Sequence, residues 1–181
     1  TMRTIRAGMF MALDGVVEAP DQWHFPYFSD EMGIAVTAQA DGVDTMLFGR
    51  KTYDSFAGAW PERELAGGPE SEYARGLGDM RKIVASHQQL DFNWRNSEQL
   101  HGDLVEFVRE LKQADGGHIA LSGSVSVVRQ LLRVGLVDEL HLLIHPIVVG
   151  HGLRLFDDGE TIPLRLLSSD AFPTGVVYSI Y

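Results

Sequence analysis

Three short polar turns in this sequence carry the residue types that bind phosphate groups. Each turn directly follows an apolar run; the turns are Gly49-Arg50-Lys51-Thr52, Ser86-His87 and Ser122-Gly123-Ser124-Val125. Between them they offer hydroxyl groups, two adjacent cations and glycines that expose backbone N–H groups. These groups are the usual partners of phosphate oxygens, above all where a helix begins. Together the turns predict a groove for a ligand that carries two or three phosphates.

The elements around the third turn explain why the turns should meet. Residues 118–121 form an apolar run, Val125, Val128 and Leu132 then recur at helical spacing, and residues 140–144 alternate as in a strand. A strand–helix–strand unit implies a sheet with parallel neighbours. Because such crossovers are right-handed, the turns emerge together at the carboxyl ends of the strands, where open sheets bind ligands.

Two common glycine-rich phosphate motifs are missing. The sequence has no G-x-G-x-x-G after its first strand and no G-x-x-x-x-G-K-[ST]. A dinucleotide fits the groove, but neither a standard Rossmann domain nor a P-loop enzyme is predicted. The Arg50-Lys51 pair also has a simpler interpretation as a solvated basic surface turn, and the residues alone leave that alternative open.

Length and composition favour one globular domain over residues 1–181. The chain is 45% hydrophobic and 22% charged, and a chain of this size buries roughly 70% of its unfolded surface. Its formal net charge of −10 argues against nucleic-acid and anionic-membrane surfaces, which need clustered Lys and Arg. Without cysteine, disulfides, thiolate metal sites and cysteine nucleophiles are excluded. No apolar run approaches the ~20 residues that cross a bilayer, so we expect a cytoplasmic protein.

The rest of the pattern predicts alternating strands and helices, followed by an antiparallel extension of the sheet. Ser29 is a candidate N-cap for a helix ending near residues 41–42, and Asp103 begins another with capping-box spacing to Glu106. Glycines and prolines predict a long loop over residues 57–80 with at most a short helix after Pro69. Strands are expected at 3–11, 45–48, 82–85, 153–156, 164–167 and 176–181, and residues 91–99 are expected to be irregular.

A loop over residues 18–28 is rich in aromatic side chains. Trp23, Phe25, Tyr27 and Phe28 fall within six residues. Such a cluster either lines the pocket of a flat ligand or closes an edge of the core, and the sequence favours neither interpretation. Trp23, Phe25 and Phe28 are therefore candidate substrate-binding residues.

Three acidic residues are candidates for acid catalysis. A carboxylate at Asp30 or Glu31 could hydrogen-bond the amidine-like edge of a pterin or pyrimidine and raise the basicity of the acceptor nitrogen. The alternative is that both are ordinary first-turn acids, which the helix dipole favours. Asp14 is the rival candidate, and its alternative role is turn formation with Gly15.

The seven histidines do not predict a metal site. His141 and His145 share one face of a strand, but residues four apart on a strand lie ~13 Å from each other, too far for one ion. We interpret the histidines as structural or surface residues. The sequence also has no G-x-S-x-G elbow, so hydrolysis is not favoured.

Three motifs resemble the dihydrofolate reductase-like family. They are Met11-Ala12-Leu13-Asp14-Gly15-Val16, the segment 47–53, and the segment from Leu121 to Phe156. The nearest branch is the C-terminal reductase domain of the bifunctional riboflavin biosynthesis deaminase-reductase. The resemblance covers essentially the whole chain. It implies a three-layer α/β fold with a mostly parallel central sheet and a C-terminal antiparallel hairpin.

The resemblance also implies NADPH as cofactor. Its phosphates and adenosine end would lie on Gly49 to Thr52, Ser86-His87 and Ser122 to Val125, with the nicotinamide beside Ala12, Leu13, Gly15 and Val16. Two departures stand out. Dihydrofolate reductases have a Gly-Gly pair where this chain has Ser122-Gly123, and no phosphoribosyl-binding set like that of the riboflavin enzyme is recognisable.

The function we expect is reduction of a small pterin-like or pyrimidine-like ring by hydride transfer from NADPH to a C=N or C=O group. The resemblance implies reactions of the 5-amino-6-(5-phosphoribosylamino)uracil reductase or dihydrofolate reductase type. The alternative is a non-catalytic NADP(H)-binding or regulatory protein on the same fold. A third alternative is a purely structural dimer in which residues 140–149 pair across subunits, and the apolar strand favours a homodimer in every case.

Overall fold

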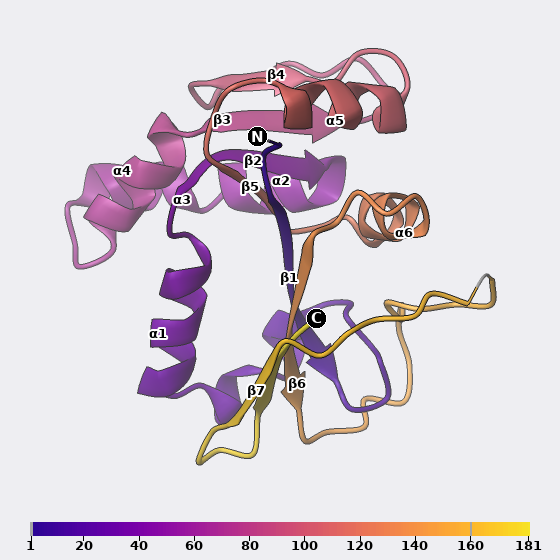
Figure 1. Ribbon diagram of the computed structural model, residues 1–181. Helices are drawn as coiled ribbons and strands as arrows, with labels where there is room; N and C mark the ends of the chain where they lie inside the picture. The colour runs from indigo at the N-terminus through magenta and orange to yellow at the C-terminus, as the bar shows by residue number, and fades with distance from the viewer. Residues whose placement is uncertain (1, 160) are drawn as a thin grey trace.

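A mixed sheet forms the middle layer of the structure, a computed structural model that describes residues 2–159 and 161–181 (Figure 1). In that part of the chain the strand order is β4-β3-β2-β5-β1-β6-β8-β7. Neighbours among β1 to β6 run parallel, whereas β8 is antiparallel to both β6 and β7. The predicted α/β class with a C-terminal antiparallel hairpin is confirmed. The strands are β1 (Ile5–Ala12), β2 (Val43–Gly49), β3 (Arg81–Ala85), β4 (Ser97–Gln99), β5 (His118–Leu121), β6 (Glu139–His145), β7 (Ser168–Ala171) and β8 (Val177–Ile180).

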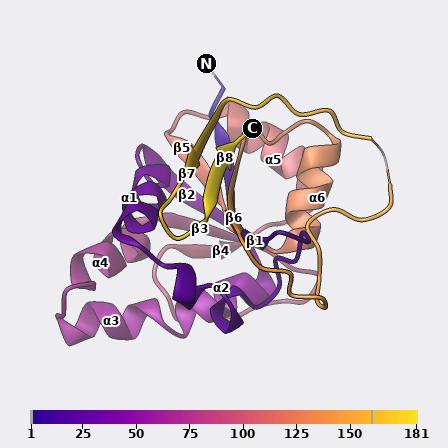
Figure 2. The same cartoon turned by 90° about the horizontal axis from the view of Figure 1, so that it is seen from below.

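Helices cover both faces of the sheet (Figure 2). Successive side chains of β2 point to opposite faces of the sheet, and both faces are apolar. Leu47 packs with Leu131 in the cluster beneath α5 and α6. Phe48 packs with Tyr53 of α2 on the other face. Each fully buried side chain of this size stabilises the fold by roughly 1.5–3 kcal/mol. None of the helices in the described part of the chain has the length and apolar character needed to cross a membrane. The helices are α1 (Asp30–Gln39), α2 (Arg50–Ala57), α3 (Trp60–Ala66), α4 (Ser71–Asp79), α5 (Leu104–Gln113) and α6 (Val125–Arg133), with 3₁₀ turns η1 (Pro20–Gln22) and η2 (Phe25–Tyr27).

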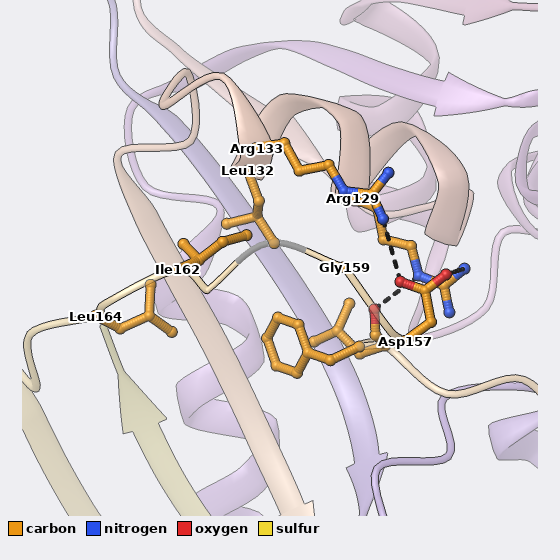
Figure 3. A pocket seen from close by; sticks show the side chains of 9 residues that line it. Arg129, Leu132, Arg133, Asp157, Gly159, Ile162 and Leu164 are labelled. Atoms are coloured by element: carbon orange, nitrogen blue, oxygen red, sulfur yellow. Dashed lines mark hydrogen bonds and ion pairs between the residues drawn. The ribbon is translucent and has the colours of Figure 1, made fainter.

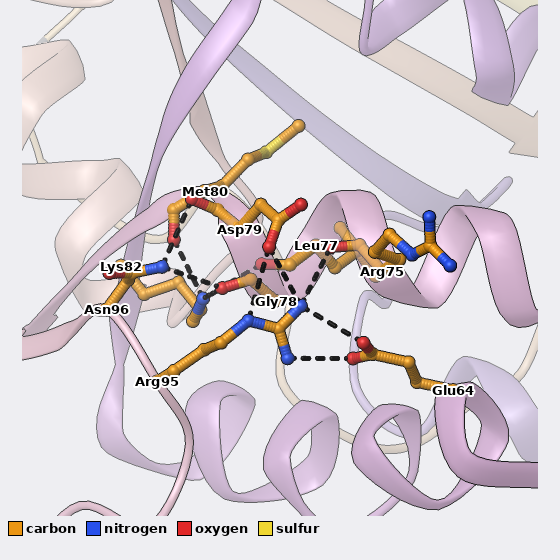
Figure 4. A network of polar contacts seen from close by, with 9 residues as sticks. All are labelled: Glu64, Arg75, Leu77, Gly78, Asp79, Met80, Lys82, Arg95 and Asn96. Atoms are coloured by element: carbon orange, nitrogen blue, oxygen red, sulfur yellow. Dashed lines mark hydrogen bonds and ion pairs between the residues drawn. The ribbon is translucent and has the colours of Figure 1, made fainter.

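The long loop predicted over residues 57–80 is wrong, because α3 and α4 occupy most of it. Gly67 ends α3 in the left-handed conformation, at φ 67°, so it divides two helices rather than preventing them. Arg95 then joins the pair, donating at 2.9 Å to Glu64 of α3 and at 2.9 Å to Asp79 of α4 (Figure 4). Because Arg95 lies outside both helices, the local pattern carries no sign of this support.

Lys82 closes the C-terminal end of α4 from β3. Its Nζ donates to the carbonyl oxygens of Leu77, Gly78 and Met80 at 2.8, 2.8 and 2.7 Å (Figure 4). The ammonium also lies 4.4 Å from the centroid of a Trp94 ring. Burial, assisted by the nearby charge of Arg95, lowers the pKa of Lys82 to about 8. A buried cation thus satisfies carbonyls that the end of a helix leaves without donors.

The C-terminal strands differ from those predicted. Arg154 makes only an isolated bridge with Val16, so residues 153–156 are not a strand. The strand expected at 164–167 begins instead at Ser168, since Leu164 and Leu166 are exposed and join no ladder. Residues 97–99 of the segment expected to be irregular form the short strand β4 beside β3. Apolar residues suggested strands here, but strands also require a partner with free backbone groups.

The predicted pairing of residues 140–149 across subunits is wrong. β6 lies inside the sheet and pairs with β1 on one side and with β8 on the other. Its backbone groups are therefore already paired within the chain. The edge strand on this side is β7, and all four of its residues are exposed.

Candidate active site

The turns after β2 and β5 form one continuous surface. The N–H of Gly49 donates to the carbonyl oxygen of Gly123 at 2.9 Å. A Cβ placed on Gly49 would lie 2.5 Å from Ser124 Oγ, and one on Gly123 would lie 2.6 Å from Thr52 Oγ1. Only glycine allows so close an approach of the two backbones. Two of the three predicted phosphate-binding turns are thus brought together directly.

Two helices start at this surface without a side-chain cap. Gly49 precedes α2 and has no side chain, and Ser124 precedes α6 but its hydroxyl accepts no first-turn N–H. By contrast, Ser29 and Asp103 cap α1 and α5 in this way, as predicted. Uncapped first turns leave N–H donors and the positive end of the helix dipole available to an anion. The surface therefore offers backbone donors to an anionic group.

The turn after β3 adjoins the same surface through Arg50. β2 and β3 are parallel, and Gly49 is in register with Ala85. The guanidinium of Arg50 donates to the side-chain oxygen of Gln88. The backbone N–H of Gln88 in turn donates to Ser86 Oγ at 3.2 Å. The structure thus brings all three predicted turns to the same end of the sheet, where β2, β3 and β5 finish. Lys51 and His87 are exposed there.

The loop after β1 is bonded to the loop after β6. The N–H of Leu13 donates to Ile147 O at 2.8 Å, and that of Ala12 donates to Val16 O at 2.9 Å. Asp14 accepts from the N–H of Gly150 at 2.9 Å. This bond is the main reason that the pKa of Asp14 lies below its usual value. Asp14 is thus engaged in holding two loops together, a role that the sequence did not predict, and its catalytic role stays a prediction.

Asp30 and Glu31 lie in the first turn of α1 and are exposed. α1 runs antiparallel to β1, because Met32 packs near Phe10 whereas Gln39 lies against Gly8. Its first turn is therefore at the same end of the sheet as Ala12. Position is compatible with the predicted catalytic role, but both carboxylates face solvent and neither lies in a closed pocket of the described structure.

The aromatic loop is divided between core and surface. Trp23 is buried, packs with Ala12 and Val16, and donates from Nε1 to Glu18 O at 3.2 Å. Phe25 and Phe28 are 65% and 55% exposed. Trp23 therefore closes the edge of the core, one of the two open interpretations, while Phe25 and Phe28 are available for a ligand.

Two buried histidines of this region escaped the sequence interpretation. His24 lies within the aromatic loop, and His145 ends β6 and is in register with Ala12. The rings of His24 and His145 are 6.0 Å apart. The sequence placed His87 in a phosphate-binding turn and predicted that the other histidines are structural or surface residues, so it assigned neither His24 nor His145 to the site. The position of His145 at the carboxyl end of a buried strand was the signal that could have identified it.

A separate cavity of about 240 Å³ lies between α6 and the arm that follows β6 (Figure 3). Its cations are Arg129 and Arg133, and both are paired with Asp157, at 3.3 and 3.1 Å. Its floor is apolar, with Leu132 and Ile162. None of the predicted site residues lines this cavity, and Asp157 offsets part of the positive charge of its two arginines.

Comparison with known proteins is consistent with the observed fold. Residues 3–178 match the family model described as the RibD C-terminal domain. The chain is 30% identical to the uncharacterized protein YyaP of Bacillus subtilis over 187 residues, which cover 99% of this chain and 94% of that protein.

Two solved structures share the fold. A Shewanella sp. PV-4 protein named for riboflavin biosynthesis has a TM-score of 0.76 at 17% identity, covering 98% of this chain and 97% of that chain. A pyrimidine reductase-like protein from Corynebacterium diphtheriae has a TM-score of 0.67 at 18% identity, covering 99% and 91%. At these identities the likeness concerns the fold. The family match spans nearly the whole chain, and the protein therefore belongs to the RibD C-terminal domain family, a reductase-like branch of the dihydrofolate reductase-like fold.

Proposed function

We propose that the protein is an NADPH-dependent reductase that transfers hydride to a C=N or C=O group of a small pyrimidine-like or pterin-like ring. The observation that carries the proposal is the contact between Gly49 and Gly123, which joins two uncapped helix starts into one anion-binding surface. Family membership supports a reductase, and a pyrimidine reductase-like protein has the same fold. A nicotinamide cofactor supplies the hydride in such a reaction.

The residues of the chain would bind and orient the reactants. N–H groups of the first turns of α2 and α6 would hold the diphosphate, and Arg50 and Lys51 would add positive charge for the remaining phosphate. Ala12 to Val16 would support the nicotinamide, because the bonds to the loop after β6 hold that segment in place. Phe25 and Phe28 would cover the reacting ring and keep water out, so that orientation and desolvation favour transfer.

Titration of intrinsic fluorescence with NADPH tests the cofactor. Arg50→Gln should weaken binding by about tenfold, since a charge-assisted hydrogen bond to phosphate is lost. Arg63→Gln is a matched control, because the side chains of Arg50 and Arg63 are each 48% exposed and each is paired with an acid. Absence of binding at about 1 mM NADPH, or equal weakening by both substitutions, would contradict the proposal.

A non-catalytic NADP(H)-binding protein is the second candidate. It is favoured by the engagement of Asp14 with Gly150 and by the exposure of Asp30 and Glu31, which leave no buried carboxylic acid among the three candidates. This function predicts NADPH binding without oxidation of the cofactor. A panel of pyrimidines, dihydropterins and quinones distinguishes the two functions, since turnover of any member excludes the second.

A homodimer in the cytoplasm remains part of the proposal. Because β6 is enclosed, we place the contact at the free edge of β7, where a second copy can continue the sheet. A proline at Ser169, inside β7, would remove a donor from that edge. Light scattering should show a dimer that Ser169→Pro weakens, and a monomer in the unmodified protein would contradict this assembly.

A further inference from the structure

His145 is held at the place where the nicotinamide is proposed to lie. Its register partner in the sheet is Ala12. The imidazole is 0% exposed, and the rings of Phe10, Trp23 and Tyr27 stand edge-on to it at 5.6, 5.1 and 5.7 Å. A strand backbone and three rings therefore fix the orientation of this side chain.

The hydrogen bonds of His145 determine which ring nitrogen is free. Nδ1 lies 2.8 Å from the carbonyl oxygen of Leu143, and a carbonyl only accepts, so Nδ1 carries the proton. Nε2 then presents a lone pair. Among the described residues no group donates to this buried atom. Buried acceptors without a donor are rare in folded proteins, and one beside a proposed reaction site points to a donor on a ligand.

His24 contacts two phenyl rings next to His145. Its ring is stacked on Phe10 at 4.6 Å with an interplanar angle of 18°, and it is tilted against Phe25 at 4.4 Å. Its Nδ1 is buried and has no donor or acceptor partner among the described residues. A flat nitrogen heterocycle therefore already occupies an aromatic slot, with its polar edge unsatisfied.

The segment that carries His24 lies outside the strands, and rotation about the side-chain bonds of His24 is enough to move its ring. The segment joins η1 and η2, two 3₁₀ turns of three residues each. Phe25, the outer ring of the stack, is 65% exposed. Trp23, the residue before His24, is buried with Ala12 and Val16 and keeps the backbone of the segment in place, so only the ring of His24 has to move.

We propose that Phe10 and Phe25 form a slot for a planar heterocycle, that His24 closes the slot in the free protein, and that His145 Nε2 accepts a hydrogen bond from a ring N–H of the substrate. The inference rests on the proposed reductase function, since it names the ring that the reductase recognises. His145 is thus a specificity-determining residue. The substrate class that follows is a pyrimidine or pterin ring with an unsubstituted N–H, because an N-alkylated ring leaves Nε2 without a donor.

A pair of ligands isolates the hydrogen bond. 5,6-Diaminouracil has ring N–H groups, and 1,3-dimethyl-5,6-diaminouracil has methyl groups in their place. Calorimetric titration without cofactor should show that the unmodified protein prefers the first ring by about tenfold or more. In His145→Phe the ratio of the two affinities should fall close to one. His145→Gln keeps an acceptor oxygen and should retain part of it.

The closing role of His24 has its own measurement. His24→Ala should bind 5,6-diaminouracil about threefold tighter or better, because no ring has to be displaced. Circular dichroism and urea unfolding establish that each variant is folded. An unchanged preference for 5,6-diaminouracil in His145→Phe would overturn the inference. So would unchanged or weaker binding of that ring in His24→Ala. A third contrary result is that neither ring binds at about 5 mM to the unmodified protein or to His24→Ala.

The same variants separate this inference from the proposed function. NADPH is titrated against each of them, because its phosphates are proposed to lie on turns that none of the substitutions touches. If the unmodified protein does not bind NADPH, the proposed reductase function is contradicted. The ring preference still decides the role of His145 in that case. Normal NADPH binding with no ring preference contradicts the slot alone.

Discussion

The backbone N–H of Gly49 donates to the carbonyl oxygen of Gly123 at 2.9 Å, and this bond joins the starts of α2 and α6. The two residues follow adjacent strands, since Leu47 of β2 is in register with Leu121 of β5. A side chain on either glycine would collide with the opposing turn. The groove therefore depends on two glycines that are 74 positions apart in the sequence.

Gly123→Ala should damage the groove. Gly123 has φ 138°, and its added Cβ would lie 2.6 Å from Thr52 Oγ1. We expect the free energy of unfolding to fall by about 1–3 kcal/mol and NADPH affinity to fall by more than about tenfold. Urea unfolding and fluorescence titration measure the two effects. Gly68→Ala is the control, because nothing lies within 4 Å of its Cβ position, and equal NADPH affinity in both variants would contradict the groove.

Asp14→Asn distinguishes a loop anchor from a general acid. The carboxylate accepts from the N–H groups of Gly150 and Val149 at 2.9 and 3.4 Å, and asparagine keeps only one acceptor oxygen. We expect KM for NADPH to rise by about three- to tenfold while the pH profile of kcat keeps its shape. Loss of one limb of that profile would instead assign proton transfer to Asp14.

The strands and turns of the groove could be predicted because their signals are local. Apolar runs ending at Phe48, Ala85 and Leu121 each precede a polar turn, and the structure brings all three turns to the same end of the sheet. Parallel pairing follows from the strand–helix–strand unit. The capped starts of α1 and α5 were equally local, since Ser29 and Asp103 bond within their own first turns.

The errors concern features that depend on distant residues. α3 and α4 are joined by Arg95, and the end of α4 is closed by Lys82, neither of which belongs to those helices. The same holds for His145, because its environment is created by rings from β1 and the aromatic loop. Periodicity reports which face of an element is apolar, but it does not report which side chain from elsewhere will fill a gap.

Lys82 should make stability depend on alkaline pH. Its pKa in the folded protein is about 8, below the ordinary value of 10.5. Between these values the unfolded chain binds the proton more strongly, so the free energy of unfolding rises with pH. At neutral pH, Lys82→Met should cost about 1–3 kcal/mol by leaving helix-end carbonyls without donors.

Urea midpoints at about pH 7 and pH 10 check this prediction. The difference in stability between the unmodified protein and Lys82→Met should grow as pH rises. Arg81→Met is the control, because Arg81 neighbours Lys82 but is exposed and pairs only with Glu98 at the sheet edge. Parallel pH curves for the unmodified protein and Lys82→Met would show that the Lys82 proton is not linked to folding.

The buried histidines should make the protein sensitive to acid. Burial is the main cause that lowers the pKa of both His24 and His145 from 6.5. Below that pH the unfolded chain binds more protons than the folded one, so the free energy of unfolding falls as pH falls. Urea midpoints at about pH 7.5 and pH 5.5 should differ less in His145→Phe than in the unmodified protein. An equal difference would place the acid sensitivity in other groups.

Hydride transfer itself is tested most directly with stereospecifically deuterated cofactor. The protein is incubated with a pyrimidine or pterin substrate identified in the turnover panel and with (4R)- or (4S)-[4-²H]NADPH, and the reduced ring is examined by mass spectrometry. A groove that fixes the nicotinamide beside Ala12 to Val16 presents one face of it, so deuterium should reach the product from one of the two cofactors only. NADPH oxidation with no deuterium in the reduced ring from either cofactor, or equal labelling from both, would contradict a reductase with this geometry.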